Sequence, residues 1–218
     1  MASSSSDLVF EALSEDTITE CLDVIAESFD VEEPVNYSLG VPKTVFRMFL
    51  QDHSDTLLKY VTPESQSLSY VVRDETTGKV VAGFINYPSA ESIPDHAMAQ
   101  FPNLGEAFQF LNQYERGEDD PPQEQQVYIA FSGVLPEYRG QGLQSRARKL
   151  IIKSARSRGY THIMSGASSY PSYRSMSALG AIERSRLVYK EWRNSLGGVP
   201  FAAAPEPHVA WCMMQLKL

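Results

Sequence analysis

Alternation of apolar and polar positions predicts strands along much of the chain. The clearest run is 127–132, where Val127, Ile129 and Phe131 alternate with tyrosine, alanine and serine, the period of two expected in a sheet. Residues 143–155 instead carry apolar side chains every three or four positions, as on one face of a helix. The sequence therefore predicts a strand, a short loop and a helix in direct succession.

The same patterns extend over the rest of the chain. They predict strands at 8–13, 67–72, 80–87, 162–167, 181–192 and 209–216, and helices from Ser14, from Pro42, at 104–114 and at 171–179. The order predicts an α+β fold, with a central mixed sheet flanked by helices and a parallel pair formed by the central strand and 162–167. We expect a single domain over residues 8–218, preceded by a flexible tail at 1–7.

The loop after the central strand is the clearest candidate for a binding site. Gly140 and Gly142 let a ligand approach the backbone, and the N–H groups from Arg139 to Gln144 face outward at the start of a helix. The partial positive charge of that helix end favours a phosphate, and a diphosphate fits best. A Rossmann fingerprint needs a third glycine where Ser145 stands, and the chain contains no Walker motif.

Composition narrows the class of protein. The 218 residues carry a net charge of −8, which argues against nucleic-acid binding, and no run of about 18 apolar residues predicts a membrane span. Cys21 and Cys212 lie in apolar patterns without metal-ligand spacing and are interpreted as buried thiols. We expect a cytoplasmic monomer without a metal ion.

The loop sequence Val-Leu-Pro-Glu-Tyr-Arg-Gly-Gln-Gly-Leu resembles the acetyl-CoA loop of the GNAT superfamily of N-acetyltransferases, whose signature is [RQ]-x-x-G-x-[GA]. Arg139 and Gly142 match that signature, whereas Gln144 stands where glycine or alanine is usual. The resemblance implies a GNAT-like fold and acetyl-CoA as cosubstrate. It places the coenzyme against Gly133, Val134, Arg139, Gly140, Gln141, Gly142, Leu143 and Gln144.

Two further segments resemble the insect-type arylalkylamine N-acetyltransferases. Glu33 precedes a proline between the first two helices, and Ser168 and Ser172 lie four apart, the second seven residues before Leu179 of a Leu-Gly pair. The resemblance implies that Glu33 is the general base and that both serines belong to the active site. Without it, Glu33 is interpreted as a solvated loop acid and the serines as helix caps. Many GNAT enzymes carry a tyrosine at the position of Met176, so Ser172 is the candidate for protonating the leaving thiolate.

The chemistry implied is acetyl transfer to a small primary amine. An amine with a pKa of about 10 is protonated at neutral pH, so a base must act before it attacks a thioester. We expect direct attack in a ternary complex, on an arylalkylamine. A polyamine, a protein amine and a non-catalytic CoA sensor remain alternatives.

Other residues carry two interpretations each. The aromatic residues near the candidate site are interpreted either as an aryl pocket or as core, and the basic residues of the central helix either as contacts to an outer phosphate or as a solvated face. The aromatic set comprises Phe29, Tyr37, Phe46, Phe49 and Tyr170, and the basic set Arg146, Lys149 and Lys153.

Overall fold

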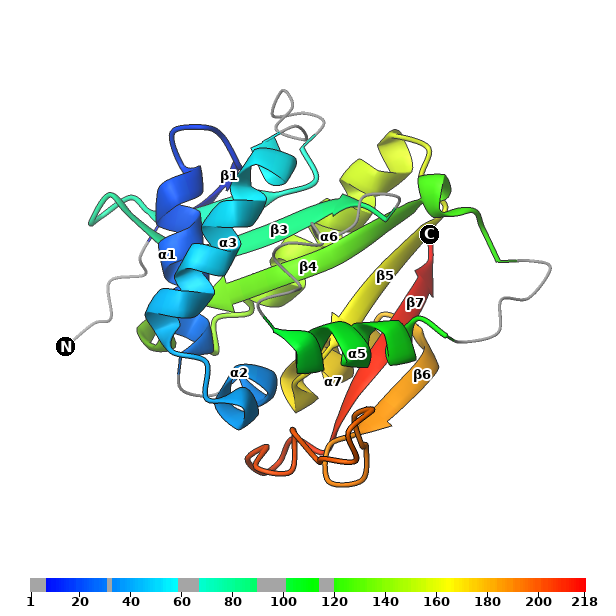
Figure 1. Cartoon of the computed structure of the whole chain (residues 1–218). Coiled ribbons are helices and arrows are strands. Elements are labelled where there is room, and N and C mark those ends of the chain that lie inside the picture. The colour runs from blue at the N-terminus through cyan, green and yellow to red at the C-terminus, as the bar shows by residue number, and fades with distance from the viewer. Residues whose placement is uncertain (1–6, 31–32, 59–66, 90–100, 114–119) are drawn as a thin grey trace.

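The computed structural model describes residues 7–30, 33–58, 67–89, 101–113 and 120–218, so most of the predicted tail lies outside it. Within the described residues, seven strands form one sheet in the order β1-β2-β3-β4-β5-β7-β6 (Figure 1). Neighbouring strands are antiparallel except β4 and β5, which are parallel. The predicted mixed sheet is confirmed. Its strands are β1 (Leu8–Ala12), β2 (Tyr70–Asp74), β3 (Lys79–Pro88), β4 (Gln126–Val134), β5 (His162–Ala167), β6 (Ile182–Val188) and β7 (Ala210–Lys217).

Helices cover both faces of the sheet (Figure 1). The face in front carries α1 (Ile18–Phe29), α3 (Lys43–Leu58) and α5 (Pro102–Leu111), with the short α2 (Pro34–Leu39) at the end of α1. The opposite face carries α6 (Leu143–Ser157) and α7 (Tyr170–Ser177). Across the described segments, no helix combines the length and the apolar character needed to cross a membrane.

Alternating side chains bury the sheet on both faces. Val71 and Ile85 pack with the apolar residues of α1 and α3. Their neighbours Val72 and Phe84 point the other way and pack with Leu143, Ala147 and Ile151 of α6. Because neighbouring strand residues point to opposite faces, one short apolar run contributes to both cores.

The sheet opens between β4 and β5. These strands pair only from Gln126 to Ile129 with His162 to Ser165, whereas β4 continues to Val134 alongside β3. The register between β3 and β4 shifts next to Ala130, which has no partner across the ladder. Such a bulge bends the strand and changes its twist. Residues 131–134 therefore leave β5, and the gap between the two strands is where an extended ligand can pair with the free edge of β4.

The strand predicted at 67–72 spans Tyr70–Asp74, and the helix predicted at 104–114 spans Pro102–Leu111. The structure also departs from the predicted elements at three other places. It adds α2, a six-residue helix too short for a periodic signal. The first helix begins at Ile18, because Ser14 forms a turn in which its carbonyl accepts the N–H groups of Thr17 and Ile18. The strand predicted at 181–192 ends at Val188, whose carbonyl accepts the Trp192 N–H in a turn.

Gly133 is required by packing between β4 and α1. A Cβ placed there would lie 2.8 Å from Ile25 Cα and 2.9 Å from Ser28 Oγ. We predict that Gly133→Ala lowers the free energy of unfolding by about 1–3 kcal/mol, the usual cost of overpacking, since backbone atoms of α1 must move. Urea denaturation measures this. Gly198→Ala, whose Cβ meets nothing nearer than the Asn194 side chain at 3.3 Å, is the control and should cost clearly less.

Candidate active site

A cavity of about 920 Å³ lies where β4 and β5 separate. Its walls come from the end of α1, the start of α2, the second half of β4, the loop at 134–145, the start of α7 and the segment 205–208. Segments far apart in sequence meet here because the sheet opens at this point. The cavity includes all three predicted catalytic residues, Glu33, Ser168 and Ser172.

Glu33 is the residue immediately before α2 and caps its first turn. Its Oε2 accepts the backbone N–H of Asn36 at 2.7 Å. The side chain is 9% exposed although it lines the cavity, which overturns the interpretation of Glu33 as a solvated loop acid. Burial raises the pKa of Glu33, while hydrogen bonds from the Asn36 N–H and the Ser168 side chain lower it in part. A carboxylate with a raised pKa at a cavity wall is suited to accept a proton.

Ser168 follows directly after β5 and lines the cavity together with Glu33. Its side chain helps to lower the pKa of Glu33, and its carbonyl accepts the Tyr189 hydroxyl at 2.5 Å. Tyr189 is fully buried and packs against Phe201. The position of Ser168 is therefore fixed from the core through its bond to Tyr189.

Ser172 lies in the first turn of α7. Its N–H donates to the side chain of Ser169, which caps the helix, at 3.4 Å. The cap of α7 is thus Ser169, and not Ser168 or Ser172 as the capping interpretation had it, and the Ser172 side chain is available at the cavity wall. The Ser172 Oγ accepts a hydrogen bond from Arg148 Nη2 of α6 at 3.4 Å.

The predicted phosphate loop has the conformation that its glycines suggested. Gly140 and Gly142 have φ of 78° and 72°, a region that other residues rarely adopt. Gly142 precedes α6 and provides no side-chain cap, so the first N–H groups of that helix are left for a ligand. Six of the eight predicted coenzyme contacts line the cavity, namely Val134, Arg139, Gly140, Gly142, Leu143 and Gln144.

The remaining two differ in position. Gln141 is exposed between the two glycines, and Gly133 faces α1 on the packed side of β4.

The Arg139 side chain donates from Nε to the Val134 carbonyl at 3.2 Å and from Nη2 to the Ser28 carbonyl at 3.4 Å. Arg139 therefore ties the loop to the ends of β4 and α1.

The basic residues of α6 divide between two environments. Arg146 lies over the ring of Phe10, 4.7 Å from its centroid, away from the cavity. Lys149 lines a second hollow of about 520 Å³ that shares Ser145, Pro171 and Ser175 with the first and also contains Arg174. Arg174 was not among the predicted residues, since only the packing of α7 beside α6 brings it next to Lys149.

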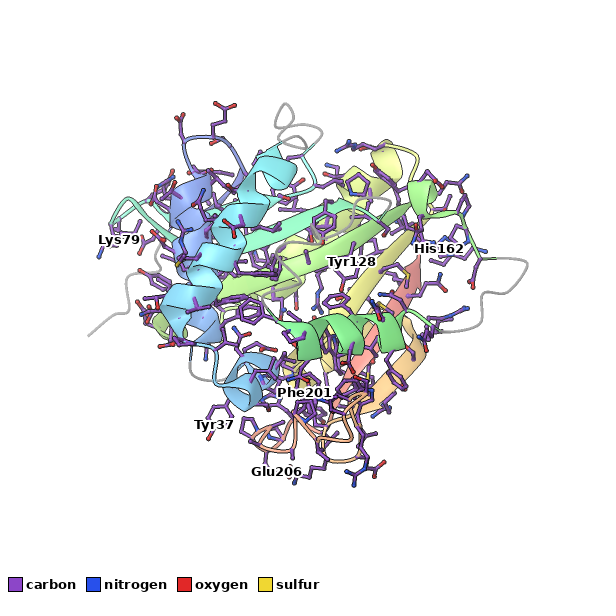
Figure 2. The ribbon with its side chains drawn as sticks, viewed as in Figure 1. Tyr37, Lys79, Tyr128, His162, Phe201 and Glu206 are labelled. Atoms are coloured by element: carbon purple, nitrogen blue, oxygen red, sulfur yellow. The ribbon has the colours of Figure 1, made fainter. Side chains whose placement is uncertain are left out.

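Aromatic residues make up one side of the cavity. Phe29, Phe46 and Phe49 stack in sequence, and they pack in the core while also lining the cavity. Tyr37 and Tyr170 are 53% and 45% exposed and do not line it; Tyr37 points outward in Figure 2.

Further aromatic residues line the cavity that no sequence pattern groups together, because they come from separate strands and from α5. They are Phe84, Tyr87, Phe108, Tyr128, Phe131 and Trp211. Tyr128 lies near the centre of the molecule (Figure 2). A Cβ on Gly166 would lie 2.7 Å from the Tyr128 hydroxyl and 2.9 Å from Trp211 Nε1, so glycine leaves room for both polar groups. The Trp211 Nε1 is buried and has no hydrogen-bond partner among the described residues.

His208 lines the cavity. Its Nδ1 accepts the backbone N–H of Tyr170 at 3.0 Å, at the start of α7. That nitrogen is therefore unprotonated, and His208 holds α7 against the segment before β7.

Comparison with solved structures gives similar folds over nearly the whole chain. The C-terminal condensation domain of Ebony, in complex with beta-alanyl-dopamine, has a TM-score of 0.74 at 17% identity, covering 97% of this chain and 99% of that one. Arylalkylamine N-acetyltransferase 2 from Aedes aegypti gives 0.69 at 20% identity, with coverage of 97% and 99%. Polyamine N-acetyltransferase from Drosophila melanogaster gives 0.72 at 19% identity, with coverage of 97% and 100%. At these identities the likeness establishes the fold.

Among curated proteins, no sequence matches the chain. The family model of the acetyltransferase (GNAT) family matches residues 42–177, more than half of the chain, including the phosphate loop and both serines. The chain therefore belongs to the GNAT acetyltransferase family.

Proposed function

We propose that this protein transfers the acetyl group of acetyl-CoA to a small primary arylalkylamine, with Glu33 as general base. The observation that carries the proposal is the buried Glu33 carboxylate, which faces the same cavity as the phosphate loop and the free edge of β4. A diphosphate on the loop and a pantetheine arm along residues 131–134 bring a thioester toward that carboxylate.

The proposed reaction is a direct attack in a ternary complex. Glu33 accepts a proton from the substrate ammonium, and the free amine attacks the thioester carbon. A backbone N–H near Val134 stabilises the oxyanion, and Ser172 protonates the departing sulfur. Cys21 and Cys212 are both buried and absent from the cavity wall, which supports transfer without an acetyl-cysteine intermediate.

The lining of the cavity favours an amine with one positive charge. Its described walls contain two carboxylates, Glu33 and Glu206, and Glu206 is paired with Lys190 at 3.1 Å. The aromatic side near Tyr128 and Trp211 carries no acid to receive a second ammonium or a guanidinium. An aryl ring fits that side by stacking and by burial of apolar surface.

Rates of thiol release from acetyl-CoA with tyramine, phenethylamine, spermidine and agmatine test this proposal. We expect the two aryl amines to have the highest kcat/KM. Higher values for spermidine or agmatine would instead assign the enzyme to polyamines. Binding of CoA without thiol release on any amine would support the sensor alternative.

The unpartnered indole N–H of Trp211 predicts a preference for a substrate that carries a hydrogen-bond acceptor on its ring. Trp211→Phe should lower kcat/KM for tyramine by about two- to tenfold, the worth of one hydrogen bond, and leave phenethylamine unchanged or improved. The ratio of kcat/KM for the two amines measures the effect. An equal loss for both would show that Trp211 acts through packing alone.

A further inference from the structure

Arg148 is a buried cation with little to compensate its charge. It lies on the inner face of α6 at 3% exposure, beside Ala147 and Ile151. Neither its Nε nor its Nη1 has a hydrogen-bond partner among the described residues, and its Nη2 donates to Ser172 Oγ at 3.4 Å. Burial lowers the pKa of Arg148 to about 10, which still leaves it charged at neutral pH. Burying a charge in this way is costly.

The contact between Arg148 and Ser172 has only one possible direction. A guanidinium donates hydrogen bonds and cannot accept them, so the Ser172 oxygen must be the acceptor. The hydroxyl proton of Ser172 is then free to be donated elsewhere, and no side chain or carbonyl of the described residues accepts it. Ser172 lines the cavity whereas Arg148 does not, so that proton is available to a bound ligand.

A serine hydroxyl is a weak acid, and a nearby positive charge is the usual means of making such a group a better proton donor. Arg148 supplies this positive charge: its guanidinium contacts the Ser172 oxygen but does not line the cavity. The position four residues later, where a tyrosine would offer a stronger acid, is occupied by the buried Met176.

We propose that Arg148 is a positioning residue that acts through Ser172, turning its hydroxyl toward the sulfur of the leaving coenzyme and stabilising the charge that develops on the serine oxygen. The proposal rests on the proposed function. As the C–S bond of the tetrahedral adduct breaks, its electron pair stays on sulfur, and the Ser172 proton passes to sulfur to give the free thiol. The serine oxygen regains a proton, through solvent, from those that the attacking ammonium releases.

A purely structural role and a positioning role predict opposite effects on stability. A structural arginine would stabilise the fold, so its loss would lower the Tm. An unpaired buried charge replaced by an apolar side chain of similar length should leave the Tm unchanged or raise it. A variant that is as stable as the wild type but slower would separate the two roles.

The test compares Arg148→Met, Ser172→Ala and the double variant, with Arg156→Met as the control because Arg156 is exposed on the same helix. Steady-state thiol release with acetyl-CoA and tyramine gives kcat and KM, and calorimetry gives the Tm and the affinity for CoA. We expect Ser172→Ala to lower kcat by roughly 100-fold, in the range for a general acid. Arg148→Met should lower kcat by about tenfold, with KM, CoA affinity and Tm not impaired. Adding it to Ser172→Ala should cause no further loss.

Each other outcome has a distinct meaning. If Arg148→Met lowers kcat equally in the wild-type and Ser172→Ala backgrounds, or lowers the Tm together with kcat, Arg148 does not act through Ser172. If Ser172→Ala is slow but Arg148→Met is not, the proposal for Arg148 fails while the role of Ser172 stands. Absence of turnover by the wild type on every amine would overturn both this proposal and the proposed function.

Discussion

Replacing Glu33 by glutamine should lower kcat for tyramine by about 100- to 1,000-fold at neutral pH, because the ammonium of the substrate then loses its base. Glutamine keeps an oxygen that accepts the Asn36 N–H, so the cap of α2 is retained. Binding of CoA should not change. Glu27→Gln is the matched control, since Glu27 lies on α1 in an exposed ion pair with Lys43 and does not line the cavity.

The raised pKa of Glu33 also fixes the sign of two pH dependences. Activity of the wild type should fall as the pH drops through that raised pKa, and this acid limb should vanish in Glu33→Gln. The stability of the fold changes with pH in the opposite direction to the activity. The unfolded carboxyl ionises at a lower pH than the folded one, so stability is lost as the pH rises from the ordinary glutamate pKa through the raised value.

At neutral pH, Glu33→Gln should therefore melt at the same or a higher temperature than the wild type. Melting curves across pH test this directly. An equal loss of activity in Glu27→Gln, or a Glu33→Gln enzyme of near wild-type kcat, would remove Glu33 from the role of base.

Replacing Gly142 by aspartate should weaken CoA binding through charge repulsion as well as through the change in backbone conformation. A Cβ at Gly142 meets nothing within 4 Å, and its φ of 72° is one that asparagine and aspartate tolerate better than other residues. Gly142→Asn and Gly142→Asp are thus nearly equal in shape. A carboxylate about 5 Å from one phosphate charge costs about 3 kcal/mol at an effective dielectric near 20. We expect Kd for CoA to rise at least tenfold more in Gly142→Asp than in Gly142→Asn.

Salt and stability provide the controls for this pair. The difference between the two variants should shrink as ionic strength increases. Gly142→Asp should be no less stable than Gly142→Asn, because an acid at the start of α6 interacts favourably with the helix dipole. Acetylated pantetheine, which has no diphosphate, should bind both variants equally. Equal Kd values for CoA would contradict the placement of a phosphate at this loop.

The sequence patterns predicted the sheet and the loop well because both depend on local order. Alternation at Val127, Ile129 and Phe131 is sufficient to define a strand, and two glycines before an amphipathic helix define the turn. The cap at Glu33 was less visible, since α2 has only six residues. The burial of Glu33 could not be predicted from its neighbours in sequence, because it depends on the packing of the whole folded chain.

The rest of the site depends on contacts across long stretches of chain. The separation of β4 from β5 follows a bulge near Ala130 that no local motif marks. In the sequence, Arg148 is one of several basic residues on α6. Only the packing of α7 places its guanidinium against Ser172, which lies 24 residues further along the chain. In the sequence, Trp211 is an ordinary strand residue. The room beside its indole depends on Gly166, which lies on the neighbouring strand.

Direct acetyl transfer from acetyl-CoA to an aryl amine in this cavity can be followed by mass spectrometry. A rapidly quenched mixture of enzyme, acetyl-CoA and tyramine reports on the product and the protein together. We expect N-acetyltyramine and free CoA in equal amounts, with the protein unmodified at every time point. An acetylated protein that forms and decays at the rate of turnover, or CoA binding without any acetylated amine, would contradict direct acetyl transfer.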